Sequence, residues 1–514
     1  MTTVGFPTQG EVLKFAFDAF GILARKHADD KKFDEVAKKN TQRALNRLAD
    51  ETGDLDSNLG QLIKDFSYLT SDVLHNRTFG AFGDVLFDLF DLYRHILKTE
   101  GTFLPKQEST RYFLLDLAPR VVVLITKALQ CNNVAADGLV MPQDALWYLP
   151  SEKDGQWEWP LPKTMKWAYE LAGTSMPGFH RPSVKNAALL EKNLDSAKSW
   201  LKGKSLPTWA SLLHNFNQSF EELHTLRAEG GLPQLLDVQK QSIRTALFLA
   251  RAATYIAKEV QRNFGDATLR EFCKRASLLQ RPLTSDAPHF RNAIQRYIVD
   301  EQIPEEHWDD VWLEMSTQYW ETLAIWQAIA FQALQDKRMS VSQVVYEARA
   351  RLGAFAALPF EQEAQNPPLY PPPEGFAEML FEGLDLLKSP DLSLPTIDDY
   401  SLRLAHGNLD EALPWLPPLL RSTYHYRRDE FETAFPFIKT AYERGCYCAG
   451  ARQYKLLNQY IELAAKNKKR REFTQGIRWA RYLGFKVRWL RDMAPTEENL
   501  EFVYTIMQKA RYAV

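Results

Sequence analysis

The sequence predicts an all-α protein made of several helical lobes. Apolar residues recur every three to four positions along most of the 514-residue chain, which is the spacing of amphipathic helices. The composition, 45% apolar and 25% charged, is that of a globular protein with a large core. The formal net charge is only −2, so any contact with nucleic acid has to come from local basic patches.

The apolar spacing of the first 135 residues predicts consecutive helices. Helical spacing of apolar residues is clearest over residues 12–20, 45–48, 62–66 and 85–97. The segment Arg111–Leu129 is apolar enough to form a strand. Its Leu-rich neighbours favour a buried helix instead, with Pro119 in the first turn.

The middle of the chain combines an irregular connector with further helices. Residues 141–162 are rich in Trp and Pro, which is typical of a connector without regular structure. Tryptophans recur at helical spacing in the segment Glu305–Gln335, and we interpret them as core residues rather than as a ligand-binding box. The predicted helices of this region are Lys163–Ala172, Pro233–Phe264, Glu305–Gln335 and Ser340–Phe355.

A proline-dense segment predicts a domain boundary. Five prolines among residues 366–373 exclude a helix and favour a stiff, extended linker. A polyproline ligand for another protein is the alternative interpretation. We divide the chain into an N-terminal helical domain (1–140), a unit with the Trp/Pro-rich connector (141–230), a central long-helix domain (231–358), the Pro-rich linker (359–375) and a C-terminal helical domain (376–514).

Residues 193–213 predict a short helix, a turn and a second helix. Ala197 and Trp200 lie on one apolar face of the first helix. Gly203 can adopt the left-handed conformation that ends a helix. Thr208 is a suitable N-cap for a helix that begins at Trp209.

This stretch resembles the recognition-helix end of the phage-repressor-like (Cro-type) helix-turn-helix. The matching string is Ser196, Trp200, Gly203, Lys204, Pro207 and Thr208. The resemblance implies that one helix enters the major groove of DNA, with serines near base edges and lysines near phosphates. The residues that it implies as nucleic-acid-binding are Ser196, Lys198, Ser199, Lys202 and Lys204. The alternative is that the string serves packing alone.

The C-terminal domain predicts helical hairpins. Two stretches between residues 400 and 445, Ala405–Leu413 and Tyr426–Phe435, resemble the middle of a tetratricopeptide repeat. In that family a small residue, here Ala412 or Ala434, lets two antiparallel helices approach. The two alanines are 22 residues apart, whereas the family repeats at about 34 residues. We therefore expect tetratricopeptide-like hairpins rather than a regular array.

A basic segment follows these hairpins. Ten lysines and arginines fall within residues 466–491, and Glu472 is the only acid there. Four aromatic residues, Trp479, Tyr482, Phe485 and Trp489, would form a ridge if the segment were one helix, although Gly484 weakens it. Such a helix could contact DNA or another polyanion, or else be a solvated or protein-facing surface. The residues predicted to bind nucleic acid are Lys468, Lys469, Arg470, Arg471, Arg478, Arg481 and Arg488.

The sequence contains no recognised catalytic, cofactor or metal motif. A complete phosphate-binding loop, a Gly-x-Ser-x-Gly elbow and a His-Glu-x-x-His string are all missing. Histidines such as His180 and His425 are isolated in the sequence, and we interpret them as packed or surface residues. The four cysteines include only one close pair, Cys446 and Cys448, and we interpret them as buried thiols. We predict no catalytic residues, no cofactor and no metal.

We therefore expect a non-enzymatic helical interaction protein. One hypothesis is a DNA-binding regulator that uses the 193–204 helix and the basic C-terminal helix. A second is a scaffold subunit that binds partner proteins without DNA contact, and a third is an enzyme whose site residues are distant in sequence. A cytoplasmic location without membrane contact is expected, because the chain has neither a signal-like segment nor an apolar run of about 18 residues.

Overall fold

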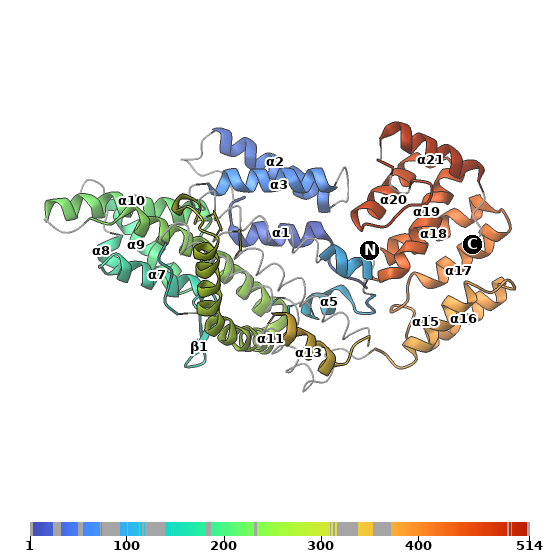
Figure 1. Ribbon diagram of the computed structural model, residues 1–514, viewed down its shortest axis with the longest axis horizontal. Coiled ribbons are helices and arrows are strands. Elements are labelled where there is room, and N and C mark those ends of the chain that lie inside the picture. Colours follow the sequence, from blue (N-terminus) through green and yellow to red (C-terminus); the bar gives the residue numbers. More distant parts are fainter. Residues whose placement is uncertain are drawn as a thin grey trace.

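The protein is helical apart from one two-stranded sheet and two isolated bridges, so the all-α prediction is confirmed (Figure 1). This statement refers to the residues that the computed structural model describes. They are 4–23, 32–49, 55–71, 73, 93–99, 101–112, 114–115, 118, 139–144, 146–180, 187–230, 234–308, 310–311, 314–315, 338–352, 372–490, 493–494 and 496–510.

The N-terminal helices are α1 (Gln9–Phe20), α2 (Lys32–Ala49) and α3 (Leu55–Thr70). At the start of α1, Glu11 N donates to Thr8 Oγ1 (3.2 Å) and Thr8 N donates to the Glu11 carboxylate (2.7 Å), a capping box. α2 and α3 pack against each other, and α1 packs on α2 (Figure 1). Most of the apolar stripe at 85–97 and of the predicted helix at 111–129 lies outside the described residues.

The Trp- and Pro-rich connector contains a β-hairpin, so the prediction of irregular structure was wrong there. β1 (Ser151–Lys153) pairs antiparallel with β2 (Gln156–Glu158). The turn residues Asp154 and Gly155 have φ angles of 51° and 73°. Asp-Gly is a preferred sequence for a turn with two positive φ angles. α7 (Pro160–Leu171) then begins three residues before the predicted helix, because Pro160 fits the first turn.

The predicted helix, turn and second helix of residues 193–213 are present. α9 (Ala187–Leu201) is followed by Gly203, whose φ of 64° is left-handed. Thr208 Oγ1 then accepts a hydrogen bond from Ser211 N (3.2 Å) in the first turn of α10 (Trp209–Glu229).

The longest element is α11 (Asp237–Asp300), which packs on both α1 and α7. Gly265, with φ 81° and ψ 171°, interrupts it. The helix predicted for Pro233–Phe264 ends just before this break. The buried face includes Ile243, Leu247 and Ala250, each 0% or 1% exposed.

One buried arginine of α11 joins three segments of the chain. Arg251 is 6% exposed, and its Nε donates to the Pro207 carbonyl (3.0 Å). A terminal nitrogen donates to the carbonyls of Asp18 (2.8 Å) and Ala19, at the end of α1. Burial lowers the pKa of Arg251 to about 10, so the side chain is still charged at neutral pH. These contacts fix the end of α1 and the turn before α10 to α11.

Shorter elements link the two halves of the chain. They are α5 (Lys106–Tyr112), the 3₁₀ turn η2 (Glu305–His307) and α13 (Val341–Leu352). α13 falls within the helix predicted at 340–355. Most of the Trp-rich segment Glu305–Gln335 and of the Pro-rich linker 359–375 lies outside the described residues.

The C-terminal residues form a stack of antiparallel helices (Figure 1). α17 packs on α18, α18 on α19, α19 on α20, and α21 covers α19. The elements are α15 (Phe376–Leu386), α16 (Leu394–His406), α17 (Leu416–Arg427), α18 (Phe431–Gly445), the 3₁₀ turn η3 (Gly450–Arg452), α19 (Gln453–Lys466), α20 (Arg470–Tyr482) and α21 (Glu497–Lys509).

The two alanines of the tetratricopeptide-like strings have different surroundings. Ala434 is 0% exposed and lies in α18, which packs closely on α17. Ala412 is also buried, but it lies in the connection between α16 and α17 rather than in a helix. The resemblance to that family stays a prediction.

The N-terminal and C-terminal parts are joined by backbone hydrogen bonds. Phe6 N donates to the Tyr447 carbonyl (2.9 Å), and Thr102 N donates to the Cys448 carbonyl (3.0 Å). The buried Gln453 side chain, in the first turn of α19, adds a hydrogen bond from Nε2 to the backbone carbonyl of residue 97 (2.6 Å). The start of α19 is therefore held from both halves of the molecule.

Replacement of Arg251 by methionine is expected to destabilise the protein by about 3 kcal/mol, because three carbonyls, two of them in buried hydrogen bonds, lose a charged donor. The measurement is the urea midpoint of unfolding at neutral pH. Arg262→Met on the same helix is the control, since its side chain is 71% exposed and pairs with Glu259. Equal loss in both variants would contradict the structural role of Arg251.

Candidate nucleic-acid interface

The residues that the helix-turn-helix resemblance assigns to DNA contact lie at the surface of α9 and the turn after it. Some of their polar groups already have partners within the protein. Lys198, Lys202 and Lys204 are exposed, and Ser196 and Ser199 are half-buried. Two of these side chains have partners nearby. The Lys198 ammonium is 3.2 Å from the Asp195 carboxylate, and Ser199 Oγ is 2.7 Å from Ser205 Oγ. This edge therefore presents a mixed charge to a phosphate backbone.

The turn after α9 is packed against the start of α7 and against α11. Trp200 is 7% exposed, as expected for the aromatic residue of the string. A Cβ at Gly203 would lie 2.7 Å from Trp159 Cδ1, so only glycine fits this backbone without a shift. Lys258 donates to the Gly203 carbonyl (2.6 Å), and its ammonium lies 5.4 Å from the Trp159 ring centre.

A single helical turn precedes α9. α8 (Met176–Phe179) has four residues, and Ser175 caps its start through a hydrogen bond from Gly178 N to Ser175 Oγ (3.4 Å). α8 contacts α7, α9 and α10, so it belongs to the same packed unit. The helix-turn-helix resemblance stays a prediction.

His180, which follows α8, is a core residue. It is 0% exposed and lies edge-on to the rings of Tyr169, Phe179 and Phe216. Its Nε2 is 2.8 Å from the Tyr169 hydroxyl, and its Nδ1 is 3.3 Å from Ser219 Oγ. Burial lowers the pKa of His180 to about 4. The interpretation of this histidine as a packed residue is confirmed.

The basic C-terminal segment folds into α20 and the chain on either side of it. Arg471, Arg478 and Arg481 are exposed at positions i, i+7 and i+10, which lie along one side of a helix. Lys468 and Lys469 are exposed in the turn before α20. Within the described part of the chain, none of these five side chains forms an ion pair with a carboxylate. We call these five residues the basic face.

Two other predicted residues have structural partners. Arg470 is 2.8 Å from a Glu501 carboxylate oxygen and 4.5 Å from the Tyr504 ring centre, so it attaches α20 to α21. The backbone N–H of Arg488 donates to Asn458 Oδ1 (3.3 Å), which fixes the chain after α20 to α19.

The single helix considered for the aromatic ridge is not formed. α20 ends at Tyr482, and Gly484 has a left-handed φ of 70°. Trp479 and Tyr482 are buried, with ring centres 5.3 Å apart. Trp479 Nε1 also donates to Gln453 Oε1 (3.2 Å). Trp479 therefore contacts the start of α19, with Tyr482 stacked beside it, and the last two aromatic residues follow the helix.

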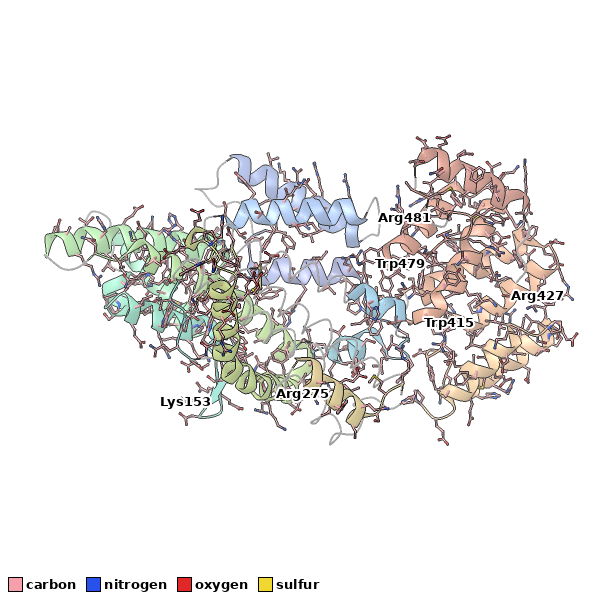
Figure 2. All side chains as sticks on the ribbon, in the orientation of Figure 1. Lys153, Arg275, Trp415, Arg427, Trp479 and Arg481 are labelled. Atoms are coloured by element: carbon pink, nitrogen blue, oxygen red, sulfur yellow. The ribbon has the colours of Figure 1, made fainter. Side chains whose placement is uncertain are left out.

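The N-terminal part contributes cations beside α20. Figure 2 shows Arg481 and Trp479 on the side of the C-terminal stack that faces α1 and α3, and α20 contacts α3. Lys98 Nζ donates to the Gly484 carbonyl (3.3 Å) and lies 5.5 Å from the Phe485 ring centre. Local sequence reasoning missed Lys98, because it is 386 residues from its partner.

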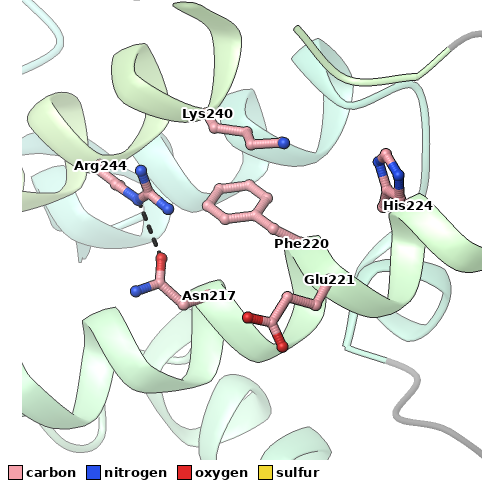
Figure 3. A pocket seen from close by; sticks show the side chains of 6 residues that line it. All are labelled: Asn217, Phe220, Glu221, His224, Lys240 and Arg244. Carbon is pink, nitrogen blue, oxygen red and sulfur yellow. Dashed lines mark hydrogen bonds between the residues drawn. The ribbon is translucent and has the colours of Figure 1, made fainter. Parts of the chain in front are cut away.

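A separate pocket of about 490 Å³ lies between α10 and the start of α11 (Figure 3). Arg244 Nε donates to Asn217 Oδ1 (3.0 Å), and the guanidinium lies 5.5 Å from the Phe220 ring centre. Lys240 pairs with Asp237 at 3.1 Å. No sequence pattern indicated this pocket, since its residues form no motif. The lining residues are Asn217, Phe220, Glu221, His224, Lys240 and Arg244.

The close cysteine pair is buried, as predicted. Cys448 Sγ donates to the Arg444 carbonyl (3.0 Å), and burial raises the pKa of Cys448 to about 12. A thiol with such a pKa is protonated and unreactive at neutral pH. In the described ranges, no group of His, Cys, Asp and Glu side chains is arranged to hold a metal ion.

No family model, curated protein or solved structure matches this chain. The basic face, α9 and the pocket are therefore judged on their own geometry. Among the described helices, none combines the length and the apolar character needed to cross a membrane.

Lowering the pH from 7 to 5 is expected to cost about 2 kcal/mol of stability through His180. The folded-state pKa of about 4 lies below the ordinary value of 6.5, so protons favour the unfolded chain. The stabilising contribution is complete above pH 6.5 and is lost as the pH falls towards 4.

The measurement compares urea midpoints at pH 7 and pH 5 for the wild type and His180→Gln. The variant should lose less stability between the two pH values, whatever its stability at pH 7. His406→Gln, at an exposed histidine, should behave as the wild type. An unchanged pH dependence in His180→Gln would contradict the assignment.

Proposed function

We propose that the protein binds nucleic acid through the basic face of α20. The observation that carries this proposal is a set of five exposed cations without carboxylate partners in the described chain: Lys468, Lys469, Arg471, Arg478 and Arg481. A chain with a net charge of −2 gains no general attraction for polyanions, so the attraction has to be local.

The geometry of α20 suits a phosphate backbone. Seven residues separate Arg471 from Arg478, which corresponds to about 10 Å along a helix axis. Arg481 lies one turn further along the same side. The opposite side of α20, with Phe473 and Ala480 buried, anchors the helix on the stack. Because the helix is already folded, its guanidinium groups can contact phosphates without the free-energy cost of ordering the backbone on binding.

Of the two helices predicted to contact nucleic acid, α9 is expected to contribute less to the affinity than α20. Asp195 lies beside Lys198 and would repel a phosphate that approaches the ammonium. Lys202 and Lys204 are exposed and could still add to binding. We assign the main contact to α20 because none of its exposed arginines forms an ion pair with a carboxylate in the described chain.

Contact with a partner protein is a second candidate function. Phe381 on α15 and Leu402 on α16 are each 60% exposed and lie on two adjoining helices, so they offer apolar surface to a partner. They adjoin in sequence the ion pair between Glu382 and Arg403, which joins the two helices. A photo-reactive amino acid at position 381 should cross-link a bound protein, whereas one at the exposed Lys388 should not.

Reversal of charge in Arg478→Glu/Arg481→Glu is expected to weaken binding of a labelled oligonucleotide about tenfold or more at physiological salt. Two phosphate contacts would be lost, so the slope of log affinity against log salt should fall by about 1.5 to 2. Fluorescence anisotropy at about 50 and about 150 mM salt measures both quantities.

Lys388→Glu/Lys439→Glu is the matched control, because it makes the same charge change at lysines outside α20 whose side chains are 76% and 43% exposed. Its affinity should stay close to that of the wild type. Lys198→Glu/Lys202→Glu measures the share of α9. Equal losses in the α20 variant and the control would mean that binding is unspecific, and the proposal would fail.

A further inference from the structure

Aromatic side chains are exposed at the end of α20, next to the basic face. Tyr454, in the first turn of α19, is 46% exposed, and Trp489 is 39% exposed. Phe485 lies against Tyr454, with ring centres 5.8 Å apart. Exposed aromatic rings beside cations offer flat apolar faces and positive charge to the same ligand.

The backbone at Trp489 is held in an unusual conformation that leaves the indole exposed. Its φ angle is 67°, in the left-handed region that costs a residue with a bulky side chain about 1 kcal/mol or more. Two neighbours enforce it. The N–H of Arg488 donates to Asn458 Oδ1 (3.3 Å), and Leu490 is 2% exposed and packed in the core. A more relaxed backbone would need one of these contacts to break.

Cations adjoin each exposed ring system. The Lys98 ammonium lies 5.5 Å from the Phe485 ring centre, and the Arg488 guanidinium lies 5.8 Å from that of Trp489. Arg481, near the end of α20, precedes Phe485 by four residues. The surface therefore combines flat apolar faces with positive charge, and it draws on both halves of the molecule.

We infer that the bound nucleic acid is single-stranded, and this inference rests on the proposed function. Unpaired bases can stack on Tyr454 and Trp489 while their phosphates contact Arg478 and Arg481. A duplex keeps its bases stacked inside and offers these rings nothing to bind. Stacking tolerates every base, so the surface should bind with little sequence preference.

The charge of the surface argues for a nucleic acid over a protein as the occupant. A protein ligand for the aromatic cluster would have to bring several acids to neutralise Lys98, Arg478 and Arg481. A nucleic-acid strand brings one phosphate with each base, in alternation with a flat ring. That alternation matches the arrangement of rings and cations described above.

The test uses the full chain and labelled oligonucleotides of about 20 nucleotides: single-stranded RNA, single-stranded DNA and a blunt DNA duplex. Anisotropy titrations compare the wild type with Trp489→Ala and Tyr454→Ala. We expect each variant to lose about fivefold or more in affinity for the single strands and to keep the weaker duplex affinity. Preference for RNA or for DNA identifies the source of the strand, and either supports the inference.

Trp489→Phe retains a flat ring and should keep most of the single-strand affinity, which separates stacking from a general effect on folding. Tyr346→Ala is the control at an aromatic residue that is 75% exposed elsewhere. Equal affinity for duplex and single strands, or no effect of Trp489→Ala, would overturn the inference. If Arg478→Glu/Arg481→Glu still reduced binding in that case, the proposed function would stand. Absence of binding to all three probes would reject both.

Discussion

The arrangement of the N-terminal half depends on one buried cation. Arg251 donates to the carbonyls of Asp18 and Ala19 at the end of α1 and to the carbonyl of Pro207. The bonds to Ala19 and Pro207 are buried, where a carbonyl without a donor is costly. A charged donor is suited to this position, because it interacts favourably with the negative end of the α1 dipole. A buried arginine without an acid partner is costly, so three carbonyls have to converge on it together. The end of α1, the turn before α10 and the middle of α11 are thereby fixed relative to one another.

Other long cationic side chains also donate to backbone carbonyls, and those that do not are the candidates for ligand binding. Arg427 donates to the carbonyls of Ser389 and Leu387 (2.8 Å to the latter), and Lys466 donates to the carbonyl of Ala510 (2.6 Å). In each case a long side chain ends on backbone carbonyls and ties elements together. The exposed arginines of α20 have no such acceptor among the described residues, although the helix that carries them is well packed. Structural need does not account for them, and this contrast is why we assign the ligand to that face.

Local structure was predictable from the sequence wherever one residue type dictates the backbone. Gly203 and Thr208 indicated the turn between α9 and α10. Gly484 was expected only to weaken a longer helix, and α20 ends before it. The hairpin at Asp154-Gly155 was equally readable, but the surrounding tryptophans and prolines obscured it. Long-range contacts left no local signal. In the sequence, nothing distinguishes Arg251 from the exposed charged residues of the same helix. Lys98 and the residues around Phe220 meet their partners only after folding, so neither the pocket nor the aromatic end of the basic face could be found from spacing.

Rigidity links these observations to binding. A stacking platform gains affinity only if its rings are held in place before the strand arrives, because ordering them on binding would cost free energy. Tyr454 lies in the first turn of α19, where Gln453 is fixed by Trp479 and by the N-terminal half. Trp489 is held by the contacts of Arg488 and Leu490 on either side. The cations of α20 stand on a helix that is packed along its whole buried side. Both components of the surface are therefore preorganised, and the junction that joins the two halves of the chain also positions the rings.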